Sequence, residues 1–265
     1  MANVPLPYFL AGLGIVGMMV GSFLNVVIYR VPNHQSIAYP PSQCPKCGHR
    51  LRPWENIPVL SWVALSGRCS SCKTSISAQY PAIEILTAAL TMLVGWQLGT
   101  VPHLLAALLF TWAILALSVI DLKAQLLSDA ITKPGIIMGL CFSMLSLWHP
   151  ADAWAFVGPV NAVIGTIAGY GSLWLVATAY RWRTGKTGMG GGDFKLLAMV
   201  GAWLGWQVVL MTIFLAAITG GAVALLYLLS GKGRHFAMPF GPYLALGAWL
   251  MMLWPQPIIA VYLSL

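Results

Sequence analysis

Long apolar segments alternate with short polar loops along most of the 265-residue chain. A helix needs about 20 apolar residues to cross the roughly 30 Å hydrocarbon core of a bilayer. The stretch 194–230 is long enough for two crossings, and Gly205 with Gln207 is the best place for a turn. The pattern predicts eight spans, the sixth of them short, at residues 8–28, 82–98, 104–120, 131–148, 154–180, 194–205, 206–230 and 242–263.

Composition supports a membrane protein. Hydrophobic residues make up 59% of the chain and charged residues 8%, whereas an ordinary soluble domain has about 25% charged residues. The mean hydropathy is +0.81. We therefore predict an all-α polytopic membrane protein of about eight transmembrane helices, with one small polar loop subdomain between the first two.

The distribution of basic residues predicts the topology, because Lys and Arg near span ends stay in the cytoplasm. With the N-terminus outside, the cytoplasmic segments are 29–81, 121–130, 181–193 and 231–241, and both termini are periplasmic. These segments, with the first residues of the adjoining spans, hold all fourteen Lys and Arg. The net charge of +8 is then explained by topology and contact with an anionic inner leaflet, and nucleic acid is not an expected partner.

The first apolar segment contains glycines at the spacing of a dinucleotide fingerprint, Gly12, Gly14 and Gly17. No strand precedes them and no βαβ unit follows, so that function is excluded. Small residues allow close approach of membrane helices. We expect Gly17 and Gly21 to serve helix packing.

Residues 31–81 form the one long polar stretch, and four of the five cysteines lie there as Cys44-Pro-Lys-Cys47 and Cys69-Ser-Ser-Cys72. Two CxxC pairs at this separation are typical of four thiolates around one Zn²⁺. About fifty residues bury little core, so the metal would supply the folding energy of this subdomain. The predicted role is structural, with Cys44, Cys47, Cys69 and Cys72 as ligands.

Two alternatives to a four-cysteine zinc site exist. A pair of disulfides requires the oxidising side of the membrane, whereas the basic residues of the loop place it in the reducing cytoplasm. His49, which lies beside Cys47, is the other candidate ligand.

Two of the six acidic residues lie where an apolar segment meets a short polar loop. Asp121 ends the third predicted span, and Asp193 follows Gly188-Met-Gly-Gly-Gly192 and precedes the sixth. A carboxylate at membrane depth costs roughly 2.5 to 3.5 kcal/mol on insertion scales, so it indicates function. The predicted topology puts both at the same face, where two carboxylates sharing a site can act as acid and base on water.

The glycines before Asp193 remove side-chain bulk and permit unusual φ values, which suits an extended substrate. Other interpretations of the two carboxylates remain. Asp193 can simply favour a helix N-terminus, and Asp121 can pair with Lys123 or Lys195. An ion-coupled transporter also uses membrane carboxylates, but it predicts them near the midplane within inverted repeats, which the sequence does not show.

Several motifs occur in an order that resembles the type IV prepilin peptidase family of GxGD-type intramembrane aspartic peptidases. They cover nearly the whole chain and include the two cysteine pairs and the segment around Asp121. The others are Gly21–Arg30, Glu55-Asn-Ile-Pro-Val-Leu-Ser-Trp62, Gln79-Tyr-Pro-Ala-Ile-Glu84, Gly190-Gly-Gly-Asp193-Phe-Lys-Leu and Pro239-Phe-Gly-Pro-Tyr243.

The resemblance implies Asp121 and Asp193 as catalytic residues and Gly190 and Gly192 as the supporting loop. It implies a bifunctional enzyme of the bacterial inner membrane, acting at the cytoplasmic face on type IV prepilins or type II secretion pseudopilins. The enzyme would cleave the basic leader and methylate the new N-terminus with S-adenosyl-L-methionine. A peptidase without methyltransferase activity is the alternative. The implied division is 1–30 (first span), 31–81 (zinc subdomain) and 82–265 (seven-span peptidase core).

Two positions depart from the family pattern, Ser128 where Pro is common and Gly191 where Tyr is common. The methyl-donor site has no sequence signal of its own. We place it near Asn25, Arg30 and Glu55, where the first span meets the cysteine loop, although capping or loop packing would also explain these residues. The sequence does not assign a role to Asp129.

Overall fold

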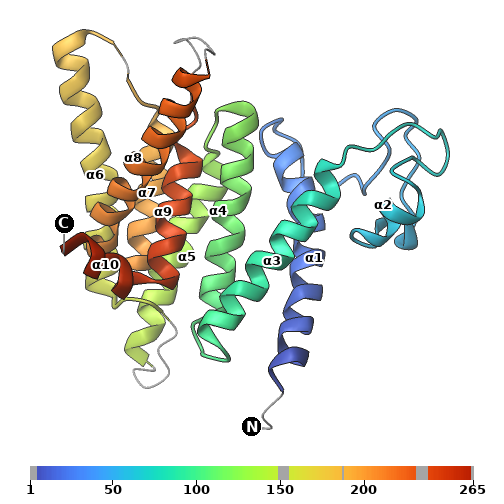
Figure 1. Cartoon of the computed structure of the whole chain (residues 1–265), viewed down its shortest axis with the longest axis horizontal. Helices are drawn as coiled ribbons and strands as arrows, with labels where there is room; N and C mark the ends of the chain where they lie inside the picture. Colours follow the sequence, from blue (N-terminus) through green and yellow to red (C-terminus); the bar gives the residue numbers. More distant parts are fainter. Residues whose placement is uncertain (1–4, 149–154, 187, 231–237, 264–265) are drawn as a thin grey trace. The chain divides into compact units, whose positions relative to one another are not determined.

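A computed structural model describes residues 5–148, 155–186, 188–230 and 238–263 (Figure 1). Within these ranges the chain is helical and its only β-structure is two isolated bridges, which confirms the predicted all-α class. The helices are α1 (Leu6–Arg30), η1 (Pro53–Asn56), α2 (Leu60–Ala64), α3 (Gln79–Leu98), α4 (Leu104–Ala124), α5 (Asp129–Trp148), α6 (Pro159–Thr184), α7 (Gly191–Leu204), α8 (Trp206–Leu229), α9 (Gly241–Leu253) and α10 (Pro255–Leu263).

Six helices of the described chain, α1, α3, α4, α5, α6 and α8, are long and apolar enough to cross a membrane. The chain is therefore a multi-pass membrane protein. α7 has 14 residues and α9 has 13. At 1.5 Å per residue each is about 20 Å long, which is shorter than the hydrocarbon core.

The turn between the sixth and seventh segments lies where the sequence predicts it. α7 ends at Leu204, and Gly205 has a φ of 84° before α8 begins. A left-handed backbone is routine only for glycine, so this residue type is required at the turn.

The apolar segment predicted as the final span, 242–263, is not one continuous helix. The structure ends α9 at Leu253 and begins a separate helix, α10, at Pro255. Proline has no backbone N–H and its ring collides with the preceding turn. Trp254, with φ −132° and ψ 55°, makes the break.

The chain forms two compact units, Met1–Thr100 and Val101–Leu265. The first contains α1, the cysteine loop and α3, and the second contains α4 to α10. The functional division at residues 30/31 and 81/82 stays a prediction.

In the first unit, α1 and α3 pack through glycines. A Cβ on Gly17 would lie 2.6 Å from Ala88 Cα, and one on Gly21 would lie 2.7 Å from Glu84 Cα. Only glycine allows such a close approach of the two backbones, which confirms the predicted packing role. Residues 31–78 extend as a separate lobe from the end of α1 and the start of α3 (Figure 1).

In the second unit, α7 is enclosed by α5, α6, α8 and α9, and every residue from Leu196 to Leu204 is buried. Gly165 and Gly201 bring the backbones of α6 and α7 into contact. Trp203 Nε1 donates a hydrogen bond of 2.8 Å to Gly135 O of α5. These contacts fix the position of the helix that carries Asp193 at its start.

The chain direction places several loop ends together within the second unit. α4, α6 and α8 end at the same side of the bundle from which α5, α7 and α9 begin (Figure 1). Asp121, Asp129, Asp193 and Gly241 therefore lie at one end of this unit.

The glycine contacts of α1 give a stability prediction. Gly17→Ala should destabilise the chain by about 1 to 3 kcal/mol because the added methyl meets α3 backbone. Gly12 has no atom within 4 Å of an added Cβ, so Gly12→Ala should be neutral or stabilise by up to about 1 kcal/mol through helix propensity. Thermal unfolding of both variants in one detergent measures the difference, and equal midpoints would contradict it.

Candidate active site and metal centre

Asp121 lies on the last turn of α4 and is only 5% exposed. Its Oδ2 atom accepts a hydrogen bond of 3.0 Å from the backbone N–H of Gly241, the first residue of α9. Unpaired N–H groups and the helix dipole make a helix N-terminus favourable for a carboxylate. The contact joins residues 120 positions apart in the sequence.

Gly241 permits this contact because it has no side chain. A Cβ there would lie 2.6 Å from Asp121 Oδ2 and 3.1 Å from a methyl carbon of Leu127. Leu127 is itself buried. It also meets Gly192, where an added Cβ would lie 2.7 Å from Leu127 Cβ. Leu127 thus lies against the beginnings of both α9 and α7.

Asp193 lies in the first turn of α7, and its backbone N–H bonds to Gly190 O at 3.3 Å. Asp121 is close enough to act on it electrostatically. The two carboxylates therefore lie at the same end of the second unit, one on the last turn of α4 and the other on the first turn of α7. Asp193 lies at a helix N-terminus, as the helix-dipole interpretation expects. That interpretation is compatible with a carboxylate pair.

The alternative ion pair of Asp121 with Lys195 is not formed. Lys195 Nζ lies 2.5 Å from Asp129 Oδ1, and Lys133 Nζ lies 2.8 Å from Asp129 Oδ2. Asp129 therefore joins the start of α5 to Lys195 of α7, one residue beyond the first turn of that helix. This pairing neutralises the lysine nearest in sequence to Asp193 and leaves Asp121 with its backbone donor.

The glycines before Asp193 differ in their surroundings. Gly190 and Gly191 are exposed and have no atom within 4 Å of an added Cβ, whereas Gly192 is confined by Leu127. Gly190 has a φ of −79°, which any residue adopts, so its backbone conformation does not require glycine. Gly192 must lack a side chain because Leu127 occupies the space beside it. Gly191 faces open space, so a larger residue can be accommodated there.

Sequence reasoning missed Gly241 and Leu127 as neighbours of the two carboxylates. The motif Pro239–Tyr243 resembles the family pattern, but the contact of its Gly241 with Asp121 has no local sequence signal. The Gly-Pro pair of this motif did signal a helix start, because proline is tolerated in the first turn.

The four loop cysteines come together in the first unit. Their sulfur atoms all lie within 4.8 Å of one another. Cys44 and Cys72 are 3.8 Å apart and Cys47 and Cys69 are 4.0 Å apart. Thiolates at the corners of a tetrahedron around Zn²⁺, with Zn–S near 2.3 Å, stand about 3.8 Å apart. The cluster can hold a tetrahedral metal ion, and none of its cysteines is in a disulfide.

The two cysteine pairs form matching turns. Cys44 N bonds to His49 O and Gly48 N to Cys44 O, while Cys69 N bonds to Thr74 O and Lys73 N to Cys69 O. One β-bridge closes each turn. Gly48 has a φ of 69° and Lys73, at the equivalent position, a φ of 56°.

The surroundings of the thiols fit a bound cation. The backbone N–H groups of Cys47 and Lys46 lower the pKa of Cys44 to about 6. The His49 N–H lowers the pKa of Cys47, but burial and the neighbouring thiols outweigh it and raise that pKa to about 11. Four adjacent thiols do not all ionise unless a cation offsets their charge, which a metal ion does.

His49 is not part of the cluster. Its Nε2 lies 3.1 Å from Glu55 Oε2. The Arg52 N–H and the Ser70 hydroxyl bond to the same carboxylate and lower the pKa of Glu55 to about 2. Glu55 thus links the first cysteine turn to the second, which supports its structural interpretation.

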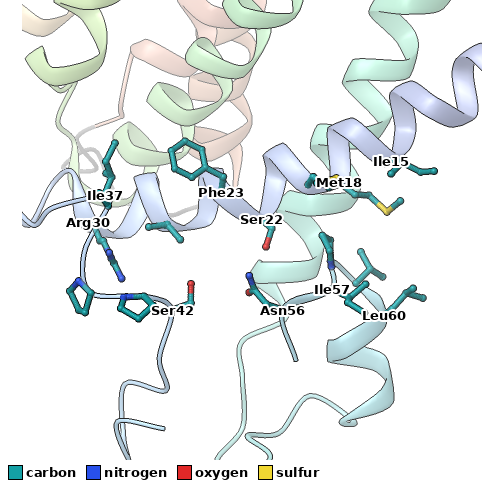
Figure 2. A pocket seen from close by; sticks show the side chains of 17 residues that line it. Ile15, Met18, Ser22, Phe23, Arg30, Ile37, Ser42, Asn56, Ile57 and Leu60 are labelled. Carbon is teal, nitrogen blue, oxygen red and sulfur yellow. The ribbon is translucent and has the colours of Figure 1, made fainter. Parts of the chain in front are cut away.

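The other two candidates for the methyl-donor site, Asn25 and Arg30, make different kinds of contact. Asn25 is buried, and its Nδ2 donates to Tyr80 O at 3.0 Å, joining α1 to α3. Arg30 Nη1 donates to Ser36 O at 2.9 Å, and Arg30 lines a cavity beside α1 (Figure 2). Of the three residues, only Arg30 lines this cavity.

Comparison with known proteins agrees with this arrangement. Residues 15–98 match the bacterial peptidase A24 N-terminal domain, and residues 107–225 match the type IV leader peptidase family. A prepilin leader peptidase/N-methyltransferase of Pseudomonas putida is 44% identical over 97% of this chain and 95% of its own length. The protein of that name from Pseudomonas aeruginosa is 40% identical over 100% and 96%, and the one from Neisseria gonorrhoeae is 41% identical over 92% and 90%.

The chain belongs to the type IV leader peptidase family. No solved structure matches it. The first matched range contains the cysteine cluster and lies within the first compact unit, while the second contains Asp121 and Asp193 and lies within the second unit. The two units thus correspond to the two matched domains of the leader peptidase.

The cysteine turns generate a metal-binding prediction for this leader peptidase. Gly48→Val should weaken metal binding about fivefold or more, because a left-handed backbone costs a β-branched residue roughly 1 to 2 kcal/mol. Gly48→Asn should change it much less, since Asn tolerates this conformation. The space around Gly48 is open, which excludes a steric cause.

Competition with a zinc-chelating indicator on the purified variants measures the apparent affinity. The native protein serves as the reference. Equal affinities of the Val and Asn variants would show that the backbone conformation is not what holds this turn.

Proposed function

We propose that this protein cleaves the leader peptide from type IV prepilins or type II secretion pseudopilins and methylates the new N-terminal residue. The relatives carry both activities in their names, prepilin leader peptidase and N-methyltransferase, and they match nearly the whole chain. The peptidase proposal is supported by two features: Asp121 accepts a hydrogen bond at the start of α9, and Asp193, in the first turn of α7, lies close enough for the charge of Asp121 to act on it.

The hydrogen bond of Asp121 suggests how the two carboxylates divide their roles. A backbone N–H donor favours the ionised form of a carboxylate, and two carboxylates sharing a site do not both ionise easily. Asp121, which accepts from Gly241 N, is therefore assigned as the base. Asp193 keeps the shared proton and is assigned as the acid.

Hydrolysis follows from these assignments. Asp121 takes a proton from a water molecule as its oxygen attacks the scissile carbonyl carbon. Asp193 donates its proton to the substrate as the tetrahedral intermediate forms. When the C–N bond breaks, a proton passes to the leaving amine, and the pair is left with one proton, as at the start.

The place of this chemistry suits the substrate class. We propose that the protein lies in the bacterial inner membrane with both termini in the periplasm and with Asp121 and Asp193 at the cytoplasmic side. Basic residues of the described second unit, among them Lys123, Lys195 and Arg181, lie at the end where α4 and α6 finish. The hydrophobic helix of a prepilin can remain in lipid while its leader enters the cytoplasm.

The second activity requires a methyl donor, which we propose to be S-adenosyl-L-methionine. This molecule supplies a methyl group on a sulfonium sulfur. We also propose that Cys44, Cys47, Cys69 and Cys72 hold one structural Zn²⁺. Four protein ligands leave no open coordination position, so the ion stabilises the fold of the lobe and takes no part in peptide hydrolysis.

Replacing either carboxylate tests the peptidase proposal. Asp121→Asn and Asp193→Asn should each lower leader cleavage at least about 100-fold, because an amide serves neither as the base nor as the acid. The assay incubates the purified protein in detergent with a prepilin substrate and follows shortening by mass spectrometry.

Metal content and the thermal midpoint serve as folding controls for these variants. Cleavage at the native rate by either variant would remove that residue from the catalytic role. A mass increase of one methyl group on the shortened product separates a bifunctional enzyme from a peptidase alone.

The glycine loop provides a matched pair of variants. Gly192→Ala should reduce cleavage about tenfold or more, because its methyl group displaces Leu127 and shifts the start of α7 relative to Asp121. Gly191→Ala places the same methyl group in open space and should cleave at the native rate. Initial rates on one prepilin substrate measure both, and equal losses would contradict the role of Leu127.

A further inference from the structure

Lys195 places a positive charge beside the proposed acid. It lies two residues after Asp193 on α7, and its side chain is only 31% exposed. The other described cations of the second unit are exposed, namely Lys123, Lys133, Arg181, Arg183 and Lys186. Solvent and salt screen exposed charges more strongly than half-buried ones. Lys195 is therefore the cation of the described second unit whose charge is screened least.

The start of α7 leaves Lys195 a way to reach the two carboxylates. Side chains on a helix lean toward its N-terminus, and a lysine has a long, flexible stem with a point charge at its end. Residues two apart on a helix do not face one another, so the ammonium group reaches Asp193 only across the helix start. That start is open, because Gly190 and Gly191 are exposed and have no atom within 4 Å of an added Cβ.

Asp129 holds Lys195 in a different place. Its Oδ1 lies 2.5 Å from Lys195 Nζ, and its Oδ2 lies 2.8 Å from Lys133 Nζ. Asp129 is the first residue of α5, where the helix dipole favours a negative charge. The charge of Lys195 therefore acts on Asp129, while the charge that acts on Asp193 is that of Asp121.

The helices behind this ion pair are packed closely. Gly135 of α5 lies against Met199 of α7, so that a Cβ on Gly135 would collide with the Met199 side chain. Trp203 Nε1 of α7 donates a hydrogen bond to Gly135 O. The start of α5 thus has a fixed place relative to α7, and Asp129 keeps the ammonium group at the start of α5.

Without the charge of Asp129, the partners of Lys195 would change. A half-buried ammonium group would remain near a helix N-terminus, where the dipole disfavours it. The other carboxylates of the described second unit are Asp121 and Asp193. An ion pair with either would favour the ionised form of that carboxylate. The pair would then lose the shared proton that the proposed acid has to donate.

We propose that Asp129 is a positioning residue of the peptidase site, which binds Lys195 and so keeps that lysine out of the carboxylate pair of Asp121 and Asp193. The inference rests on the proposed peptidase function and adds a residue to its machinery. Asp129 acts on the two carboxylates only through Lys195, by preserving their shared proton.

Other titratable groups lie on the helices packed against α7. They are Tyr170 and Tyr180 of α6, Tyr227 of α8 and Tyr243 of α9, beside the exposed cations named above. Apart from Lys133 in its own control, these groups are the same in every variant below. A difference between two pH profiles therefore comes from Asp129 and Lys195.

The pH dependence of leader cleavage by the purified full-length protein tests the proposal. Asp129→Asn should move the alkaline limb of the pH–rate profile to lower pH by about one unit or more, because Lys195 then favours loss of the shared proton. Above that limb the rate should fall about tenfold or more. The ratio of the variant rate to the native rate should rise again as the pH is lowered.

Four matched variants separate this role from a structural one. Adding Lys195→Met to Asp129→Asn removes the freed charge and should restore the native alkaline limb. Asp129→Glu keeps a carboxylate, and Lys133→Met removes the other lysine while leaving Lys195 paired, so both should keep the native profile. Lys195→Met alone should also keep it, because the native lysine does not act on the carboxylate pair. Thermal midpoints show which variants are folded.

A purely structural link between α5 and α7 gives a different result. Asp129→Asn would then lower the rate equally at every pH, and Lys195→Met would not restore it. That outcome, or a native alkaline limb in Asp129→Asn, would overturn the proposal. If Asp129→Asn does not fold, Lys195→Met still decides, since a shift of its alkaline limb to higher pH would show that the lysine already acts on the pair.

The carboxylate variants distinguish failure of this inference from failure of the proposed function. If Asp121→Asn and Asp193→Asn are inactive while Asp129→Asn keeps the native profile, only the role of Asp129 is wrong. If the native chain does not cleave a prepilin, or if Asp193→Asn cleaves at the native rate, both proposals fail.

Discussion

The hydrogen bond from Gly241 N to Asp121 Oδ2 is the constraint around which the second unit is built. It requires a helix to begin beside the carboxylate and a residue without a Cβ at that beginning. Leu127 fills the space that remains and presses against Gly192 at the start of α7. A single polar contact therefore fixes three chain segments and, through them, the place of Asp193.

The position of the contact between Gly241 and Asp121 is related to the short lengths of α7 and α9. Both helices are shorter than the hydrocarbon core, and both begin at the end of the unit where α4 and α6 finish. Longer neighbours enclose α7 on several sides. Asp121 and Gly241 are both buried, so their hydrogen bond is separated from bulk water and is stronger than it would be at the surface.

The sequence predicted the helices, the clustering of the four loop cysteines and the placing of the two carboxylates at one end of the helices, because each has a local signal: an apolar run, a spacing or an acidic residue in an apolar context. It did not predict the contact of Asp121 with Gly241 or that of Asp129 with Lys195, since each joins distant segments without a pattern of its own. Pro255 indicates a helix break at Trp254, but the long apolar segment around it favoured the prediction of a single span. The roles assigned to the carboxylates rest on chemistry and on the relatives.

The lobe of residues 31–78 leaves and returns through α1 and α3, whose backbones touch at Gly17 and Gly21. That touching pair depends on no metal ligand. The contact of α1 with α3 and the closing of the cysteine turns therefore rest on separate sets of residues, so damage to the cysteine lobe leaves the contact between the two membrane helices in place.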